Sequence, residues 1–161
     1  MRAAGWPAPV AALLLAAWLG ASLYFTVVVT RAAFAVLPSR ALAGALVGQT
    51  LPALFNAGMV VGIVLMALAR VMPPGAARTT TLMGGAAIFA LTALARFVVL
   101  ARIARMRVAM PVAIDSLSVD DPARRAFGQL HALSVGALGL AMLTGIVVAI
   151  VLAHFLSAAH D

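Results

Sequence analysis

The sequence contains neither cysteine nor lysine, and its only acids are four aspartates, Asp115, Asp120, Asp121 and Asp161. Without cysteine the chain has no disulfide framework and no thiolate metal site, and the redox compartment stays undecided. All eleven basic residues are therefore arginine, and the formal net charge is +7. No basic surface interleaved with aromatic residues accompanies that charge, so we expect lipid phosphates rather than nucleic acid as its partners.

The sequence also lacks catalytic motifs. It has no glycine-rich phosphate loop, no His-Glu-x-x-His, no pair of carboxylates within an apolar run and no cysteine nucleophile. Ser22 and Ser134 are too weakly placed to indicate a hydrolase. The three histidines and eight methionines are scattered and show no metal-ligand spacing. We therefore expect neither an enzyme nor a metal site.

Long apolar runs are what the sequence does contain. Hydrophobic residues make up 65% of the 161 residues, and the mean hydropathy is +1.16, which indicates an integral membrane protein. The first run, residues 10–29, holds twenty uncharged residues and matches the roughly 30 Å hydrocarbon core at about 1.5 Å per residue. A cleaved signal peptide is the competing interpretation, but this run is too long for its apolar region.

We expect four spans, at approximately residues 9–37, 40–70, 79–104 and 122–157. They predict a single all-α transmembrane domain over residues 1–161, with four helices in an antiparallel up-down bundle. Pro52 falls inside the second span, where it removes one backbone hydrogen bond and predicts a kink.

The connections contain turn and cap residues. The first turn is expected at residues 37–40, where Ser39 caps the second helix. Residues 72–75 (Met-Pro-Pro-Gly) predict the second turn, and the threonines at 79–81 offer caps for the third helix. Asp121 and Pro122 are the expected cap and first residue of the fourth helix. The charges there predict two ion pairs at i, i+4 spacing, Asp120 with Arg124 and Asp121 with Arg125.

The arginines are distributed unevenly between the two faces of the expected membrane domain. The face with both termini has Arg2, Arg70 and Arg78, and the opposite face has Arg31, Arg40, Arg102, Arg105, Arg107, Arg124 and Arg125. The positive-inside rule places the second face in the cytoplasm and both termini outside. On the cytoplasmic face we expect surface contacts with lipid phosphates at Arg40, Arg102, Arg105, Arg107, Arg124 and Arg125.

Glycines recur at helical spacing, which predicts close approach between helices. The second span contains two small-xxx-small pairs, and packing within the chain is favoured over dimerisation for both. We expect helix packing at six glycines: Gly44, Gly48, Gly58, Gly62, Gly128 and Gly136.

Four polar residues, Arg31, Gln49, Arg96 and His131, fall at one expected depth, roughly 9–15 Å from the cytoplasmic helix ends. None has an acid at its own level, and an unpaired arginine in hydrocarbon is costly. Three interpretations stay open. The arginines extend to the headgroups, an aspartate of residues 115–121 folds back to neutralise one of them, or the layer forms an anion site. Its occupant would be a lipid headgroup, a carboxylated ligand or an acidic group of a partner protein.

His131 has a structural and a functional interpretation. It neighbours Ser134, and the Ser134 hydroxyl or a backbone carbonyl can satisfy one ring nitrogen, so a packed structural histidine is favoured over a proton relay. Ligation of haem or chlorin by His131 is the other alternative. A b-type haem would need a second facing ligand, and His154 lies too far along the same helix. We therefore expect no cofactor.

One pattern of apolar, aromatic and small residues extends over most of the chain: Trp18-Leu19-Gly20, Phe25, Val28-Val29, Phe34, Leu37-Pro38, Ala43-Gly44, Gly48, Pro52 and Leu54-Phe55, then Phe127-x-x-Leu130-His131-x-Leu133-Ser134. It resembles an uncharacterised bacterial family of four-span proteins related to transmembrane protein 205. Such proteins often have an asparagine soon after the histidine-serine motif, where this chain has Gly136 and Ala137. The resemblance implies a four-span protein of the bacterial inner membrane, and it implies no biochemical function.

Two functions fit these observations. The first is a non-enzymatic accessory or structural subunit that packs against lipids and other membrane proteins in a larger assembly, of the respiratory or photosynthetic type. The alternative is a small transporter or permeability factor for an anion or amphiphile, with the Arg31, Arg96 and His131 layer as its site. Transport would require a homo-oligomer, because four helices rarely enclose an aqueous path.

Overall fold

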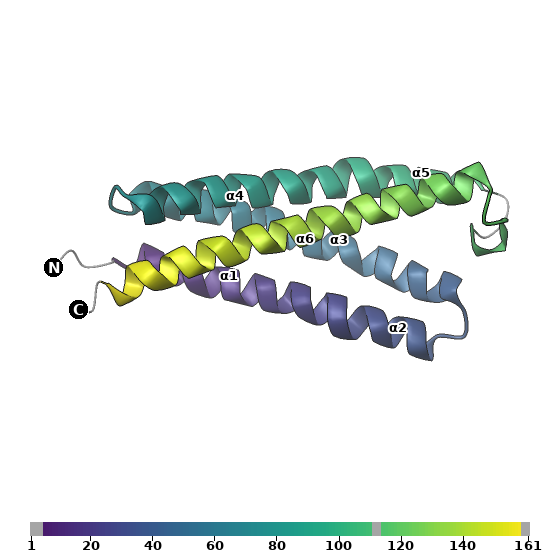
Figure 1. Ribbon diagram of the computed structural model, residues 1–161, viewed down its shortest axis with the longest axis horizontal. Coiled ribbons are helices and arrows are strands. Elements are labelled where there is room, and N and C mark those ends of the chain that lie inside the picture. The colour runs from purple at the N-terminus through teal and green to yellow at the C-terminus, as the bar shows by residue number, and fades with distance from the viewer. Residues whose placement is uncertain (1–4, 111–113, 159–161) are drawn as a thin grey trace.

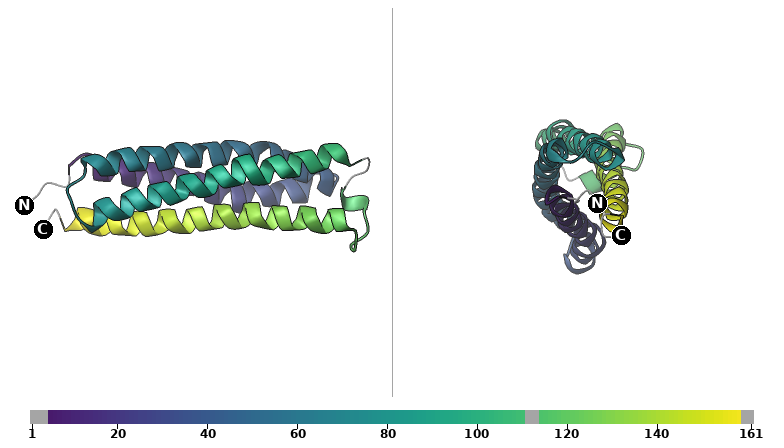
Figure 2. Two further views of the ribbon diagram at one scale, coloured as in Figure 1. Left: turned by 90° about the horizontal axis from the view of Figure 1, so that it is seen from above. Right: turned by 90° about the vertical axis from the view of Figure 1, so that its left-hand side faces the viewer.

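The computed structural model describes residues 5–110 and 114–158, and every regular element in this part of the chain is a helix. Four helical rods lie side by side (Figure 1). They run over Pro7–Val36, Arg40–Val71, Ala76–Ala109 and Pro122–Ser157, and each is long and apolar enough to cross a membrane. This confirms the predicted number of membrane-spanning helices. Successive rods run in opposite directions, so the first helix begins where the last one ends (Figures 1 and 2).

The first and third rods are built alike. The first consists of α1 (Pro7–Tyr24), the π-helical segment η1 (Phe25–Val29) and α2 (Thr30–Val36). The third consists of α4 (Ala76–Leu94), the π-helical segment η2 (Ala95–Val99) and α5 (Leu100–Ala109). The α-helices before the two π segments have 18 and 19 residues, so the π segments lie at a similar distance along their rods. Single π turns inside α-helices often mark functional positions.

The second and fourth rods are uninterrupted α-helices. They are α3 (Arg40–Val71) and α6 (Pro122–Ser157), and a short 3-10 turn, η3 (Ile114–Ser116), precedes α6. Pro52 lies inside α3, which continues through it. The rods have 30 to 36 residues, about 45–54 Å at 1.5 Å per residue, so they are longer than a hydrocarbon core of about 30 Å.

Two of the three predicted helix starts are correct. The Ser39 hydroxyl accepts a hydrogen bond from the Leu42 amide at 3.2 Å, and the Asp121 carboxylate accepts one from the Ala123 amide at 2.7 Å. The third helix differs, because it begins at Ala76, before the threonines expected to cap it. Its N-cap is Gly75, whose φ of +151° suits glycine, and Thr81 bonds inside the helix to the Ala77 carbonyl.

The core lies between α1, α3, α4 and α6. α1 and α4 each pack against both α3 and α6, and the largest fully buried apolar side chains come from all four: Leu15, Phe55, Leu65, Ile88, Val148 and Leu152. The α3–α4 contact is the most extensive. A Cβ added at Gly62 would lie 2.6 Å from the Gly85 carbonyl oxygen, and one at Gly58 would lie 2.6 Å from a Thr92 methyl carbon. Both glycines therefore let backbones approach, as their spacing predicts.

Beyond the π segments the bundle divides into two pairs of helices. α2 packs mainly against α3, and α5 packs mainly against α6 and η2. The two pairs diverge toward the right-hand end of Figure 1. Polar groups between the pairs can therefore lie close to the bundle axis without being enclosed by the core.

Candidate functional site

Most arginines of the described chain lie at the end where the helix pairs diverge, which we call the arginine end. Its members come from four helices: Arg31 (α2), Arg40 (α3), Arg102, Arg105 and Arg107 (α5), and Arg124 and Arg125 (α6). The opposite end has Arg70 on α3 and Arg78 on α4. Arg2, His160 and Asp161 lie outside the described residues. The two ends of the bundle thus differ strongly in positive charge.

Asp120 and Asp121 interact with the first turn of α6 and not with Arg31 or Arg96. Asp120 forms an ion pair with Arg125 at 3.2 Å, while Arg124 donates to the Leu117 carbonyl at 2.7 Å. The two predicted i, i+4 pairs are therefore wrong. Asp121, as the N-cap, has an extended backbone, so Asp120 is not on the helix and helical spacing does not apply to it. Both side chains of the ion pair are exposed, so it stabilises the fold little.

Arg107 connects the two diverging helix pairs. Its terminal nitrogen donates to the Gly44 carbonyl at 3.4 Å, and a Cβ added at Gly48 would lie 2.9 Å from the guanidinium. The space beside Gly44 and Gly48 is therefore occupied by an arginine side chain, whereas their spacing predicted a neighbouring helix there. On its other side the Arg107 guanidinium carbon lies 5.4 Å from the centroid of the Phe127 ring. This is cation–π distance, and it joins α5 to α6 as well as to α3.

His131 continues this row of side chains. Its ring stacks on Phe127, with centroids 6.5 Å apart and planes 3° from parallel. The Ser134 hydroxyl donates to the His131 backbone carbonyl at 2.8 Å and not to the ring, so of the two expected partners of the imidazole, Ser134 is not the one. The structure thus aligns Arg107, Phe127 and His131. The sequence predicted a polar role for His131 and a lipid-phosphate contact for Arg107, but nothing in its pattern related Arg107 to a ring on the next helix.

Arg96 lies in η2 and reaches toward α3. Its Nε donates to the Asn56 side-chain oxygen at 3.2 Å, and its guanidinium carbon lies 5.5 Å from the Phe97 ring centroid. Side chains lean toward the N-terminus of their helix, and for Arg96 that direction is away from the arginine end. Asn56 was not among the predicted site residues, although it is the one amide in the apolar stretch 51–69.

The four residues of the predicted layer form no bond with one another in the described part of the structure. Arg31, Gln49 and His131 are exposed and Arg96 is half-buried. Within the described residues, no hydrogen bond, ion pair or ring contact joins any two of them. Arg96 bonds Asn56 and His131 stacks on Phe127, so these two have different surroundings.

A groove runs between α5 and α6 near the arginine end. It has a volume of about 570 Å³ and is lined by Arg102, Arg105, Met106, Ala126, Gln129, Leu130 and Leu133. Arg105 uses its Nε for the Ala101 carbonyl at 3.3 Å. The groove thus places two guanidinium groups and an amide beside an apolar wall.

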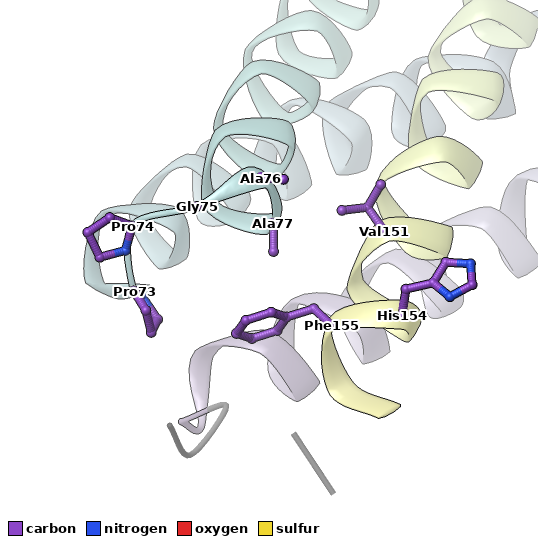
Figure 3. Close-up of a pocket in the computed structure, with 8 residues that line it drawn as sticks. All are labelled: Pro73, Pro74, Gly75, Ala76, Ala77, Val151, His154 and Phe155. Atoms are coloured by element: carbon purple, nitrogen blue, oxygen red, sulfur yellow. The ribbon is translucent and has the colours of Figure 1, made fainter. Parts of the chain in front are cut away.

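A second hollow, of about 340 Å³, lies at the opposite end, between the 73–75 turn and the last turns of α6 (Figure 3). Its walls are mainly apolar. Figure 3 shows the Phe155 ring extending toward Pro73, while the His154 imidazole points away from the turn. Among the described residues that line this hollow, the only titratable side chain therefore does not face it.

The described residues contain no group of three or more His, Cys, Asp or Glu that could hold a metal ion. The remaining predicted packing glycines behave differently from those of α3. A Cβ added at Gly128 or Gly136 would have nothing within 4 Å. These positions on α6 are open on the outside of the bundle.

Four helices of membrane-spanning length with apolar outer surfaces define a multi-pass membrane protein. Residues 13–112 match the family model described as Domain of unknown function (DUF4149), and since this is more than half of the chain, the chain belongs to that family. The match covers the first rod from residue 13 onward and the whole of the second and third rods, and it ends before α6. No curated protein and no solved structure matches the chain.

Proposed function

We propose that this protein is a non-enzymatic subunit of a larger membrane assembly, which contacts a partner membrane protein through the outer face of α6. The observation that supports this most directly is the open glycine face of that helix. Gly128, Gly136 and Gly139 would each meet nothing within 4 Å on gaining a Cβ, and Ala132 between them is exposed. Small residues four apart on a lipid-facing helix allow another helix to approach closely.

The open glycines of α6 differ from the glycines that are packed inside the bundle. The space beside each of four other glycines is filled by other residues of this chain: Gly58, Gly62, Gly84 and Gly85. Glycine lowers helix stability relative to alanine, so a run of open glycines has a cost that packing inside this chain does not offset. A helix of another protein lying on the face would offset it.

We further propose a placement in the membrane. The excess of arginine at the arginine end supports a cytoplasmic position for that end and a periplasmic position for both termini. We propose the bacterial inner membrane as its location, because of its resemblance to proteins related to transmembrane protein 205. We also expect a bend in α3 at Pro52. The assembly we expect is of the respiratory or photosynthetic type, and the protein itself needs no cofactor for this role.

Purification from native membranes in mild detergent tests the proposal. The wild-type chain should retain a partner protein in fixed stoichiometry, and Gly136→Leu should lose it because the added side chain blocks helix approach. Gly20→Leu is the matched control, since Gly20 on α1 is also open. Recovery of the wild-type chain alone, or equal loss in both variants, would refute the α6 contact.

A second candidate is a small transporter or permeability factor for an anion or amphiphile. The observation that favours it is the half-buried Arg96 with its Asn56 contact, because an arginine within a span favours an anion nearby. It predicts a homo-oligomer without other proteins and anion flux in reconstituted vesicles. Flux that persists in Arg96→Gln would exclude this candidate.

A further inference from the structure

The groove between α5 and α6 has the features of a binding site that faces the membrane. Arg102, Arg105 and Met106 are spaced i, i+3, i+4 and so share one face of α5. Ala126, Gln129, Leu130 and Leu133 follow the same spacing on α6, so two helix faces meet along the groove. This side of α6 differs from the open glycine face, by roughly 110° at 100° per residue. The two faces adjoin at Gln129 and Gly136, so an occupant of the groove is tested at Arg102, Arg105 and Ala126, which lie away from the glycine face.

The polarity of the groove changes along its length. α5 runs toward the arginine end and α6 runs away from it (Figure 1). Met106 and Ala126 therefore lie nearest that end, Arg105 is the next residue inward on α5, and Arg102 and Leu130 lie about one turn further into the bundle. Both arginine positions are thus in the outer and middle part of the groove, and Leu133, about two turns in, continues its apolar wall toward the expected hydrocarbon. An amphiphile with an anionic head would find its two parts in this order.

The polar groups of the groove have free hydrogen-bonding capacity. Among the described residues, Arg102 and Gln129 form no hydrogen bond, and Arg105 uses only its Nε. No acid is among the described residues that line the groove. The nearest aspartates in sequence are engaged elsewhere, Asp120 with Arg125 and Asp121 with the Ala123 amide. Two adjacent guanidinium groups can bind a phosphate through several charge-assisted hydrogen bonds.

We propose that this groove binds an anionic phospholipid. Arg102 and Arg105 hold the phosphate, and Gln129 donates to a headgroup oxygen. One acyl chain lies along Leu130 and Leu133. The volume of about 570 Å³ admits a headgroup with the first part of a chain, and basic pockets between membrane helices are known to bind anionic headgroups. The apolar wall is the reason to assign a lipid rather than free phosphate.

Native mass spectrometry of the full chain, from vesicles of phosphatidylglycerol and phosphatidylcholine with equal acyl chains, tests the assignment. We expect retention of phosphatidylglycerol, weakened by at least about tenfold in the Arg102→Gln/Arg105→Gln variant. Ala126→Phe should weaken it as well, because the ring fills the outer part of the groove without changing the charge. If the double variant fails to fold, the retention of phosphatidylglycerol by Ala126→Phe still tests whether the lipid lies in the groove.

Arg31→Gln/Arg40→Gln is the matched control, because it removes two exposed arginines from the same end outside the groove. It should leave retention within about twofold of wild type, since the groove keeps both its arginines. Equal loss in the control, or full retention in both groove variants, overturns the proposal. Displacement of the lipid by inorganic phosphate at equal concentration would also overturn it, because the site would then recognise phosphate alone.

Discussion

The guanidinium carbon of Arg107 lies 5.4 Å from the ring centroid of Phe127, and the same guanidinium donates to the Gly44 carbonyl on α3. One side chain thus contacts both helix pairs at the end where they diverge. Arginine is suited to this because its planar group can stack on a ring and donate at its edge at once. We infer that this contact limits how far the pairs separate.

Arg107→Gln should therefore destabilise the arginine end. A cation–π contact at an exposed site contributes about 0.5–1 kcal/mol, so we expect a double-mutant cycle with Phe127→Leu to give a coupling energy in that range. Thermal unfolding in detergent measures it. Arg40→Gln, at the same end and without a described contact, is the control and should shift stability little. A coupling energy of zero would show that the ring and the guanidinium do not stabilise one another.

Gly62→Ala should destabilise the bundle by about 1–3 kcal/mol, the usual range for overpacking. The added Cβ would lie 2.6 Å from the Gly85 carbonyl oxygen, so two backbones must move apart. Gly20→Ala meets nothing within 4 Å and replaces a glycine inside a helix, so it should be neutral or slightly stabilising. The two midpoints of thermal unfolding give the comparison. Equal midpoints would mean that α3 and α4 are not packed this closely.

Asn56→Leu should lower the free energy of unfolding by more than the contribution of the lost hydrogen bond, because it leaves Arg96 without its partner amide. Side-chain hydrogen bonds in membrane proteins contribute about 0.6 kcal/mol on average and at most about 2 kcal/mol. The Asn56→Leu/Arg96→Leu double variant should recover part of the loss, since no unpaired cation remains. Unfolding of all three variants in one detergent tests this. A double variant less stable than the sum of both single losses would contradict it.

Asp121→Ala should destabilise the start of α6 by about 1 kcal/mol, a typical loss for an N-cap. Asp120→Ala removes only an exposed ion pair and should cost about 0–0.5 kcal/mol. Amide hydrogen exchange over residues 123–126 measures the difference. If both variants exchange alike, the Asp121 carboxylate does not cap the helix.

The helices were predictable from sequence because their causes are local. Apolar runs of span length, the Ser39 and Asp121 caps and the 72–75 turn each act within a few residues, and all three features have the expected positions. The start of the third helix was misplaced for a related reason. Gly75 and the threonines at 79–81 both resemble helix starts, and only the backbone geometry of Gly75 distinguishes them.

The polar contacts were less predictable, because they depend on the registration of helices distant in sequence. Arg96 and Asn56 are 40 residues apart, and Arg107 and Gly44 are 63 apart. Depth counted along each helix says how far a residue lies from an end, but not which neighbour it faces. The π segments η1 and η2 were also missed, since an added residue in a helical turn leaves no mark in an Ala- and Val-rich sequence.

Site-specific cross-linking from the outer face of α6 tests whether a partner membrane protein lies on that face. The chain has no cysteine, so Ala132→Cys can hold a single photoreactive probe, with Gly20→Cys as the control on α1. After irradiation of native membranes, the subunit role predicts one cross-linked protein of defined mass from position 132 and none from position 20. Cross-links to lipid alone at position 132, or the same products from both positions, would contradict it.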